Sequence, residues 1–182
     1  MRVFIAVNIP DDTKDRIYSF IEILKKKESE GIKYVAKENL HLTLKFLGEI
    51  DKDNLELINE SLSNIDFNLF NLILKGTGCF PSLLNPRVLW IGIKDDKKNL
   101  FNLFRKIESN LPKNLSKGED RDFSPHLTIA RFKLKPAEEF IDFIKSEKDI
   151  YFGKLFVTSF CIYESILKSS GPVYIKLNEF FC

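Results

Sequence analysis

The sequence contains few cysteines and lacks any long hydrophobic run. Its three cysteines, Cys79, Cys161 and Cys182, are odd in number and widely spaced, so they argue against a disulfide framework and favour a reducing compartment. No stretch approaches the roughly 18 consecutive apolar residues that a membrane-spanning helix needs. We therefore expect a cytoplasmic protein without a membrane partner. The formal net charge of +2 neither requires nor opposes an anionic ligand.

Several motifs that mark other classes of enzyme are also missing. There is no Cys-x-x-Cys pair or His-Glu-x-x-His motif for zinc, and no Gly-x-Ser-x-Gly elbow for a nucleophilic serine. The segment Gly76-Thr77-Gly78 is too short for a dinucleotide-binding or phosphate-binding loop, and we interpret it as a turn within a loop. We therefore expect neither a cofactor nor a bound metal.

The apolar periodicity predicts strands and helices that are interleaved along the 182 residues. Strands are predicted at residues 2–8, 32–35, 40–47, 69–75, 87–93, 126–133, 151–167 and 173–177. Helices are predicted from Pro10 to the charged run at 25–28, and over residues 51–62, 98–111 and 136–145. Because hairpin-like connections also occur, we predict an α+β fold with largely antiparallel sheets.

The only two histidines, His41 and His126, are each followed by Leu-Thr and an aliphatic residue. Side chains alternate along a strand, so each histidine shares a face with the threonine two positions later, Thr43 or Thr128. With 23 Leu and five Thr in the chain, a second His-Leu-Thr arises by chance with a probability of roughly one in 300. The numbers 41 and 126 differ by 85, near half the chain length, which indicates two related lobes.

Paired acid–base catalysis suits these residues better than the alternatives do. Structural zinc needs four ligands and catalytic zinc usually three, whereas neither motif adds an acid or a cysteine to its polar face. Imidazole titrates near neutrality, so one histidine can accept a proton while the other donates one. Hydrolysis of a phosphodiester needs both on opposite sides of phosphorus, and threonine hydroxyls can hold the non-bridging oxygens. The residues alone leave open which histidine is the acid.

The two His-x-Thr-x motifs and their flanking segments resemble the 2H phosphoesterase superfamily and, within it, the RNA 2′,3′-cyclic phosphodiesterases of the LigT type. The resemblance runs from end to end of the chain. It rests on the segments RVFIAVNIP (2–10), NLHLTLKFLGEI (39–50), GTGCFPS (76–82), PRVLWIGI (86–93), FSPHLTIAR (123–131) and SILKSSGPVYIKL (165–177).

The resemblance implies one domain over residues 1–182 with two pseudo-symmetric lobes, each an antiparallel sheet with helices outside, and an active-site cleft between them. It implies metal-independent opening of a terminal 2′,3′-cyclic phosphate to a 2′-phosphate; reversal of this chemistry would be 2′-5′ RNA ligation. By motif match, His41 corresponds to the proton donor, His126 to the proton acceptor, and Thr43 and Thr128 to phosphate-holding hydroxyls. The expected ligands are RNA 3′ ends or nucleotides that bear a 2′,3′-cyclic phosphate. We expect a monomer without an obligate protein partner.

Two cations beside the motifs are further candidates for substrate binding. Lys45 continues the parity of His41, so it could offset phosphate charge, although a solvated lysine at the strand edge is the alternative. Arg131 follows the second motif, and strict alternation places it on the face opposite His126. A role for Arg131 at the site therefore requires a bulge or the end of the strand.

Aromatic residues near the motifs have two interpretations. Phe46, Phe80 and Phe123 could stack against a base, but in a chain with 17 Phe we favour core positions for them. Trp90 lies among apolar strand residues, so we also predict that it belongs to the core.

Two other functions stay open at this stage. One is a phosphodiesterase of the same superfamily that acts on small cyclic nucleotides or 2′-5′-linked oligonucleotides. The other is a non-catalytic module that binds RNA ends. The presence of both histidines argues against the second.

Overall fold

The computed structural model describes residues 1–182 except 28–29, 114, 116–122 and 170. The helices are α1 (Asp11–Lys27), α2 (Lys52–Ser63), α3 (Asn99–Asn110) and α4 (Glu138–Ser146), with a short 3-10 helix η1 (Lys37–Asn39). The strands are β1 (Arg2–Asn8), β2 (Ile32–Tyr34), β3 (His41–Glu49), β4 (Phe70–Phe80), β5 (Val88–Lys94), β6 (His126–Phe132), β7 (Tyr151–Val157), β8 (Ser159–Lys168) and β9 (Gly171–Phe181).

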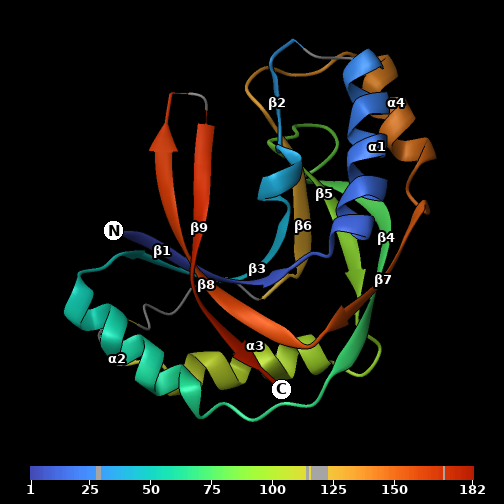
Figure 1. The fold of residues 1–182 in the computed structure, drawn as a ribbon. Coiled ribbons are helices and arrows are strands. Elements are labelled where there is room, and N and C mark those ends of the chain that lie inside the picture. The colour runs from blue at the N-terminus through green and yellow to red at the C-terminus, as the bar shows by residue number, and fades with distance from the viewer. Residues whose placement is uncertain (28–29, 114, 116–122, 170) are drawn as a thin grey trace.

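The strands form two antiparallel sheets (Figure 1). The four-stranded sheet has the order β3-β1-β8-β9, and the five-stranded sheet has the order β2-β6-β5-β4-β7. All of the paired strands run antiparallel. The predicted α+β fold with two antiparallel sheets is therefore confirmed.

Helices cover one face of each sheet. In Figure 1, α2 and α3 lie along the four-stranded sheet, and α1 and α4 flank the five-stranded sheet. On the four-stranded sheet the inward residues Val3, Ile5 and Val7 of β1 join one buried cluster with Ile58 of α2 and Leu103 of α3. Each such side chain, when fully buried, contributes about 1.5–3 kcal/mol to folding. In the described parts of the chain, no helix is both long and apolar enough to cross a lipid bilayer.

Side-chain oxygens accept hydrogen bonds from backbone N–H groups at the start of two helices. The Asp51 carboxylate caps α2 by accepting a hydrogen bond of 2.8 Å from the backbone N–H of Asn54. Ahead of α3, Asp95 accepts hydrogen bonds from the backbone N–H groups of Asn99 and Leu100. These N–H groups have no partner within the helix, so each cap contributes about 1 kcal/mol to helix stability.

The predicted loop at Gly76–Gly78 is wrong, because these residues lie inside β4. The pairing register of β4 shifts between Leu74 and Thr77, and Gly76 there has a φ of +79°. A Cβ on Gly78 would lie 2.4 Å from the Trp90 ring, so the strand admits only glycine at this point without a shift of that ring. The two glycines therefore mark a bulge and a close approach within a strand, not a turn.

The predicted strand at 151–167 is two strands in different sheets. β7 pairs with β4 in the five-stranded sheet, whereas β8 pairs with β1 and β9 in the four-stranded sheet. The chain passes from one sheet to the other at Thr158, whose carbonyl oxygen accepts a hydrogen bond from the N–H of Cys182. The turn interpreted from residues 169–172 includes residue 170, which lies outside the described residues.

Candidate active site

The two strands that begin with a histidine lie next to each other. β3 is an edge strand of the four-stranded sheet, and it contacts β6 of the five-stranded sheet (Figure 1). His41 is the first residue of β3, and His126 is the first residue of β6. The fold thus brings together two motifs that are half a chain apart in the sequence.

Both imidazoles are held by the same local hydrogen bond. Nδ1 of His41 lies 2.7 Å from the carbonyl oxygen of Asn39, and Nδ1 of His126 lies 2.8 Å from the carbonyl oxygen of Ser124. Because a carbonyl oxygen can only accept, Nδ1 carries the proton in each ring. In both histidines Nε2 is therefore the nitrogen available to accept a proton or, when protonated, to donate one.

His41 lies among aromatic rings. Its ring centroid is 4.8 Å from that of Phe4 and 5.0 Å from that of Tyr174, which is nearly perpendicular at 87°. Burial lowers the pKa of His41 below its usual range, and the charges of Lys14 and Arg131 act in the same direction, while the hydrogen bond to Asn39 opposes them. His41 is therefore neutral at pH 7 in the free protein.

The ring of Phe80 stands beside His126. The two centroids are 4.9 Å apart at an interplanar angle of 85°, and Phe80 also contacts the ring of Trp90. Trp90 is directly opposite Thr128 in the β5–β6 pairing, so it shares the face of the second motif. The prediction that Trp90 belongs to the core is wrong, because its strand position places it on this half-buried face.

Both motif strands contain a bulge immediately after the threonine. In β3 the pairing passes from Thr43 to Lys45, so Leu44 is the extra residue. In β6 it passes from Thr128 to Ala130, so Ile129 is the extra residue. A bulge inserts one residue and reverses the alternation beyond it. The two motifs therefore share a backbone irregularity as well as a tetrapeptide.

The bulge moves Lys45 away from the histidine face. Lys45 pairs with Ile5, whose side chain points to the core, so the predicted parity with His41 is wrong. The Lys45 side chain is only 1% exposed, and its Nζ lies 2.8 Å from Oε1 of Glu108 on α3. It is neither a solvated lysine nor a group on the site face, and it joins β3 to the helix behind it.

The second bulge has the opposite effect on Arg131. It returns Arg131 to the face of His126 and Thr128, where the side chain is exposed. A role for Arg131 at the site required a bulge in its strand, and the structure contains this bulge. Burial lowers the pKa of His41 and raises that of Tyr174; the charge of Arg131 adds to the lowering at His41 and opposes the rise at Tyr174. The guanidinium from the second motif therefore lies within electrostatic range of the first.

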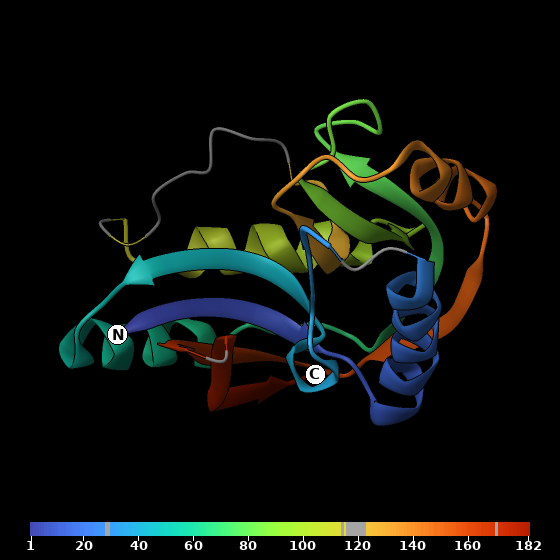
Figure 2. The same cartoon turned by 90° about the horizontal axis from the view of Figure 1, so that it is seen from above.

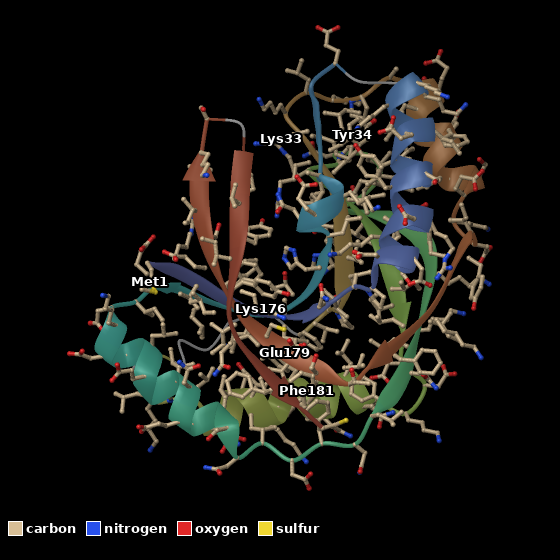
Figure 3. All side chains as sticks on the ribbon, in the orientation of Figure 1. Met1, Lys33, Tyr34, Lys176, Glu179 and Phe181 are labelled. Atoms are coloured by element: carbon tan, nitrogen blue, oxygen red, sulfur yellow. The ribbon has the colours of Figure 1, made fainter. Side chains whose placement is uncertain are left out.

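The start of β9 and the strand β2 approach each other beside the site. Asn39 donates a hydrogen bond of 2.7 Å from Nδ2 to the carbonyl oxygen of Pro172. Lys33 lies on β2 (Figure 3). Its Nζ is 3.8 Å from the position that a Cβ on Gly171 would occupy. These contacts link the segment that carries Tyr174 to the backbone that holds His41.

Sequence reasoning missed Phe4 and Tyr174 as neighbours of His41. Phe4 occupies the same phase of β1 as Ala6 and Asn8, which pair with Thr43 and His41. The alternation of side chains along β1 could therefore have predicted that Phe4 lies on the face of His41. Tyr174 comes from the last strand, so only the tertiary arrangement could reveal its position. Among the residues that the structure describes, no three His, Cys, Asp or Glu side chains gather closely enough to hold a metal ion.

Known proteins share both the sequence and the fold of this chain. The sequence is 39% identical over 181 residues to the RNA 2′,3′-cyclic phosphodiesterase of Methanocaldococcus jannaschii, covering 98% of this chain and 99% of that protein. It is 37% identical over 180 residues to the protein of the same name from Archaeoglobus fulgidus, covering 99% of both. The structure of Escherichia coli LigT complexed with 3′-AMP superposes with a TM-score of 0.79 at 25% identity, covering 99% of this chain and 97% of LigT.

A protein from Thermus thermophilus, TT0787, also superposes, with a TM-score of 0.77 at 30% identity, over 100% of this chain and 97% of that one. The family model described as LigT like phosphoesterase matches twice, at residues 7–90 and 91–174, so that each match contains one histidine motif. With matches of this extent in sequence and structure, the chain belongs to the LigT-like phosphoesterase family.

Proposed function

We propose that this protein is an RNA 2′,3′-cyclic phosphodiesterase that opens a terminal 2′,3′-cyclic phosphate to a 2′-phosphate. The observation that carries the proposal is the matched pair of imidazoles on neighbouring strands, each with Nδ1–H bound to a backbone carbonyl and with Nε2 left for chemistry. Relatives that cover nearly the whole chain bear the name of this activity.

The proposed reaction uses one histidine as base and the other as acid. Nε2 of His126 takes a proton from water while the water oxygen bonds to phosphorus. The bond from phosphorus to the 3′ oxygen breaks, and Nε2 of His41 donates its proton to that oxygen. Two histidines on opposite sides of phosphorus allow this in-line displacement, and a second proton transfer through solvent resets the pair. The donor and acceptor roles follow the family match.

Protonation of His41 would accompany substrate binding. Burial keeps His41 neutral in the free protein, yet the proposed acid must be protonated. A phosphate anion beside Nε2 favours the imidazolium and so raises the pKa of His41. Substrate would thus create the charged acid at the point where it is needed, and product release would return the proton.

The remaining polar groups would stabilise the phosphate. Thr43 and Thr128 share the faces of their histidines, so their hydroxyls can donate hydrogen bonds to the non-bridging oxygens. Arg131 adds a planar pair of donors and a positive charge on the same face. Lys45 has no part in this scheme because it faces α3.

We further propose that residues 1–182 act as one bilobal, monomeric, cytoplasmic unit that needs no metal or other cofactor. Support for one unit comes from the buried cluster, which contains residues from both sheets and from helices α1 to α4. A second candidate function, hydrolysis of small cyclic nucleotides, is favoured by one observation: the related LigT was crystallised with the mononucleotide 3′-AMP. Ligation of 2′-5′ ends would be the reverse of the proposed reaction.

The test is a product assay in the presence of EDTA. The protein is incubated with an oligoribonucleotide that ends in a 2′,3′-cyclic phosphate, and phosphorus NMR identifies the product. We expect a 2′-phosphate and an unchanged rate with chelator. A 3′-phosphate product would contradict the assigned leaving group, and loss of activity in EDTA would contradict metal independence. Binding without turnover would favour an RNA-end binding module.

A further inference from the structure

The imidazole of His126 is held by two contacts of different kinds. Its Nδ1 lies 2.8 Å from the carbonyl oxygen of Ser124, two residues earlier in the chain. This hydrogen bond fixes one nitrogen, but the ring can still tilt about it. The perpendicular ring of Phe80, at a centroid distance of 4.9 Å and an interplanar angle of 85°, opposes that tilt. The direction of Nε2 therefore depends on where the Phe80 ring lies.

The ring of Phe80 is in turn held by Trp90. Phe80 is the last residue of β4, so the strand continues on only one side of it. The rings of Phe80 and Trp90 have centroids 5.2 Å apart at an interplanar angle of 38°. Trp90 lies on the neighbouring strand β5, which runs side by side with β4 in Figure 2. Trp90, Phe80 and His126 thus form a chain of three rings that begins on β5 and ends at the site.

Two glycines make room for the indole of Trp90. A Cβ on Gly78, which pairs with Trp90, would overlap the indole carbons Cζ2 and Cη2, and a Cβ on Gly92 would lie 3.6 Å from Cζ3. The six-membered ring therefore covers backbone that a glycine leaves open. Among the residues that the structure describes, none accepts a hydrogen bond from the buried Nε1 of Trp90. The indole is thus held by its packing on the two strands.

The lobe of the four-stranded sheet is built differently at the corresponding positions. The residue opposite the motif threonine is Ala6 in that lobe and Trp90 in the other. The next residue across the sheet is Cys161 beside Ala6, and Gly78 beside Trp90. A small residue beside a larger one is thus replaced by a large residue beside glycine. The combination of indole and glycine therefore distinguishes the surroundings of His126 from those of His41.

We propose that Phe80 and Trp90 are positioning residues for the general base. Trp90 fixes the ring of Phe80, and Phe80 fixes the plane of the His126 imidazole, so that Nε2 points at the attacking water. This inference rests on the proposed function, because it takes His126 to be the base. A base must lie within hydrogen-bond reach of the proton that it removes, and a misplacement of about 1 Å can lower the rate about 100-fold.

The first experiment measures kcat and KM on an oligoribonucleotide that ends in a 2′,3′-cyclic phosphate. Phe80→Leu removes the perpendicular ring but keeps most of the apolar volume, so kcat should fall about tenfold while KM stays within about twofold of the wild-type value. Phe80→Tyr keeps the ring and should keep most of kcat. Phe143→Leu is the matched control, because Phe143 is also half-buried and also contacts another ring, but it lies on α4. It should leave kcat unchanged.

A double-variant cycle tests whether Trp90 acts through the position of its indole. Gly78→Ala keeps every atom of the indole but displaces it, because the new Cβ would overlap the ring. It should lower kcat as Phe80→Leu does. Trp90→Leu should lower kcat by a similar factor, since it leaves Phe80 without its ring partner. In the Trp90→Leu background, Gly78→Ala should therefore cost little more. Additive losses would overturn the role given to the indole.

Nuclear magnetic resonance gives a measurement that does not depend on turnover. The chain has two histidines, so isotope-labelled imidazoles give two sets of signals, and His126→Gln assigns them. At a pH where both rings are neutral, the nitrogen shifts report the ratio of the Nδ1–H to the Nε2–H tautomer. Phe80→Leu and Trp90→Leu should each lower this ratio at His126 about fivefold, the effect expected for the loss of one aromatic contact. The ratio at His41 should not change.

The outcomes distinguish this inference from the proposed function. If the wild type hydrolyses the substrate and Phe80→Leu keeps the wild-type kcat, the inference is wrong while the function stands. A rise in KM at constant kcat would assign Phe80 to substrate binding and also overturn the inference. If the wild type does not hydrolyse the substrate, the function is wrong, and the tautomer ratio then decides the inference.

An unchanged ratio at His126 in Phe80→Leu overturns the inference whether or not the protein is active. Equal changes at His41 and His126 would show a general effect on the fold and overturn it as well. Thermal melting of each variant checks that the fold is retained.

Discussion

Thr43 and Lys45 are two residues apart in β3, yet their side chains lie on opposite faces of the four-stranded sheet. Thr43 pairs with Ala6 and Lys45 pairs with Ile5, so Leu44 is accommodated as a bulge. The same irregularity occurs at Ile129 in β6. One inserted residue in each motif strand thus keeps a cation inside the first lobe and presents a cation, Arg131, on the site face of the second.

Replacement of Lys45 should therefore affect stability. Lys45→Ala removes one member of a buried ion pair and leaves Glu108 without this partner, so the free energy of unfolding should fall by about 3 kcal/mol. Lys145→Ala is the matched control, since Lys145 pairs with Asp142 at an exposed site and should cost less than about 1 kcal/mol. Chemical denaturation measures both. Wild-type stability combined with lost turnover would mean that Lys45 acts on the substrate.

Replacement of Arg131 should affect catalysis. Arg131→Ala removes a charged donor on the face of His126, and we expect kcat/KM to fall about 100-fold with little change in stability. Arg131→Lys retains the charge but not the planar pair of donors, so it should restore only part of the activity. Arg2→Ala, an exposed arginine at the start of β1, serves as the control. Equal kcat/KM for Arg131→Ala and wild type would remove Arg131 from the site.

The histidines should act as a pair. His41→Ala and His126→Ala should each lower kcat by at least about 100-fold, while the affinity for a 2′-phosphate-ended oligonucleotide persists. The double variant should be little slower than either single variant, because the two groups serve one proton-transfer event. The wild-type rate should follow a bell-shaped pH profile. Full turnover in either single variant would assign that histidine a structural role only.

Binding of a phosphate-bearing ligand should be accompanied by proton uptake. The lowered pKa of His41 leaves the ring neutral at pH 7, and an anion beside it raises that pKa, so the complex holds more protons than the free protein. Calorimetric titration with a 2′-nucleotide in buffers of different ionisation enthalpy measures the uptake. His41→Gln should reduce it. Identical heats in all buffers would show that His41 does not change its protonation on binding.

The free energy of unfolding should also depend on pH, in the direction set by the lowered pKa of His41. Because the folded state favours neutral His41, this residue contributes fully to stability above the unfolded pKa of about 6.5. That contribution is lost as the pH falls from there through the lower pKa of the folded protein. The free energy of unfolding of the wild type minus that of His41→Gln is the quantity to follow. This difference should shrink as the pH is lowered from 7. A difference that grew on acidification would mean that folding favours the charged ring.

Most of the fold could be predicted from the sequence because hydrophobic alternation indicates which face of a strand is buried. The boundaries of β1 match the prediction, and those of β3 and β6 lie within two residues of it. The bulge in β3 could not be predicted. Polar and apolar residues alternate without a break in His-Leu-Thr-Leu-Lys-Phe, so the sequence does not mark Leu44 as the extra residue. The second bulge did leave a signal, namely the adjacent apolar pair Ile129-Ala130.

Other predictions were wrong or missing where the residues that determine the local structure are distant in the sequence. Gly76 and Gly78 suggested a turn, but Gly78 lies in a strand under the ring of Trp90. The segment at 151–167 does carry a polar pair, Thr158-Ser159, where the chain changes sheet, but a second pair, Glu164-Ser165, lies inside β8, so a polar pair alone does not indicate a change of sheet. The neighbours of His41 likewise depend on β1 and β9, which only the assembled sheet brings together.

The passage of the chain at Thr158 has a consequence for how the repeat is built. The family match divides the sequence after residue 90, within β5, yet each sheet takes strands from both halves. The first half supplies β1 and β3 to one sheet but needs β8 and β9 to complete it, and β2 and β4 are completed by β6 and β7. The duplicated segment is therefore not an autonomous folding module. Because the two halves exchange strands, the partnership of His41 and His126 is fixed by topology as well as by surface contact.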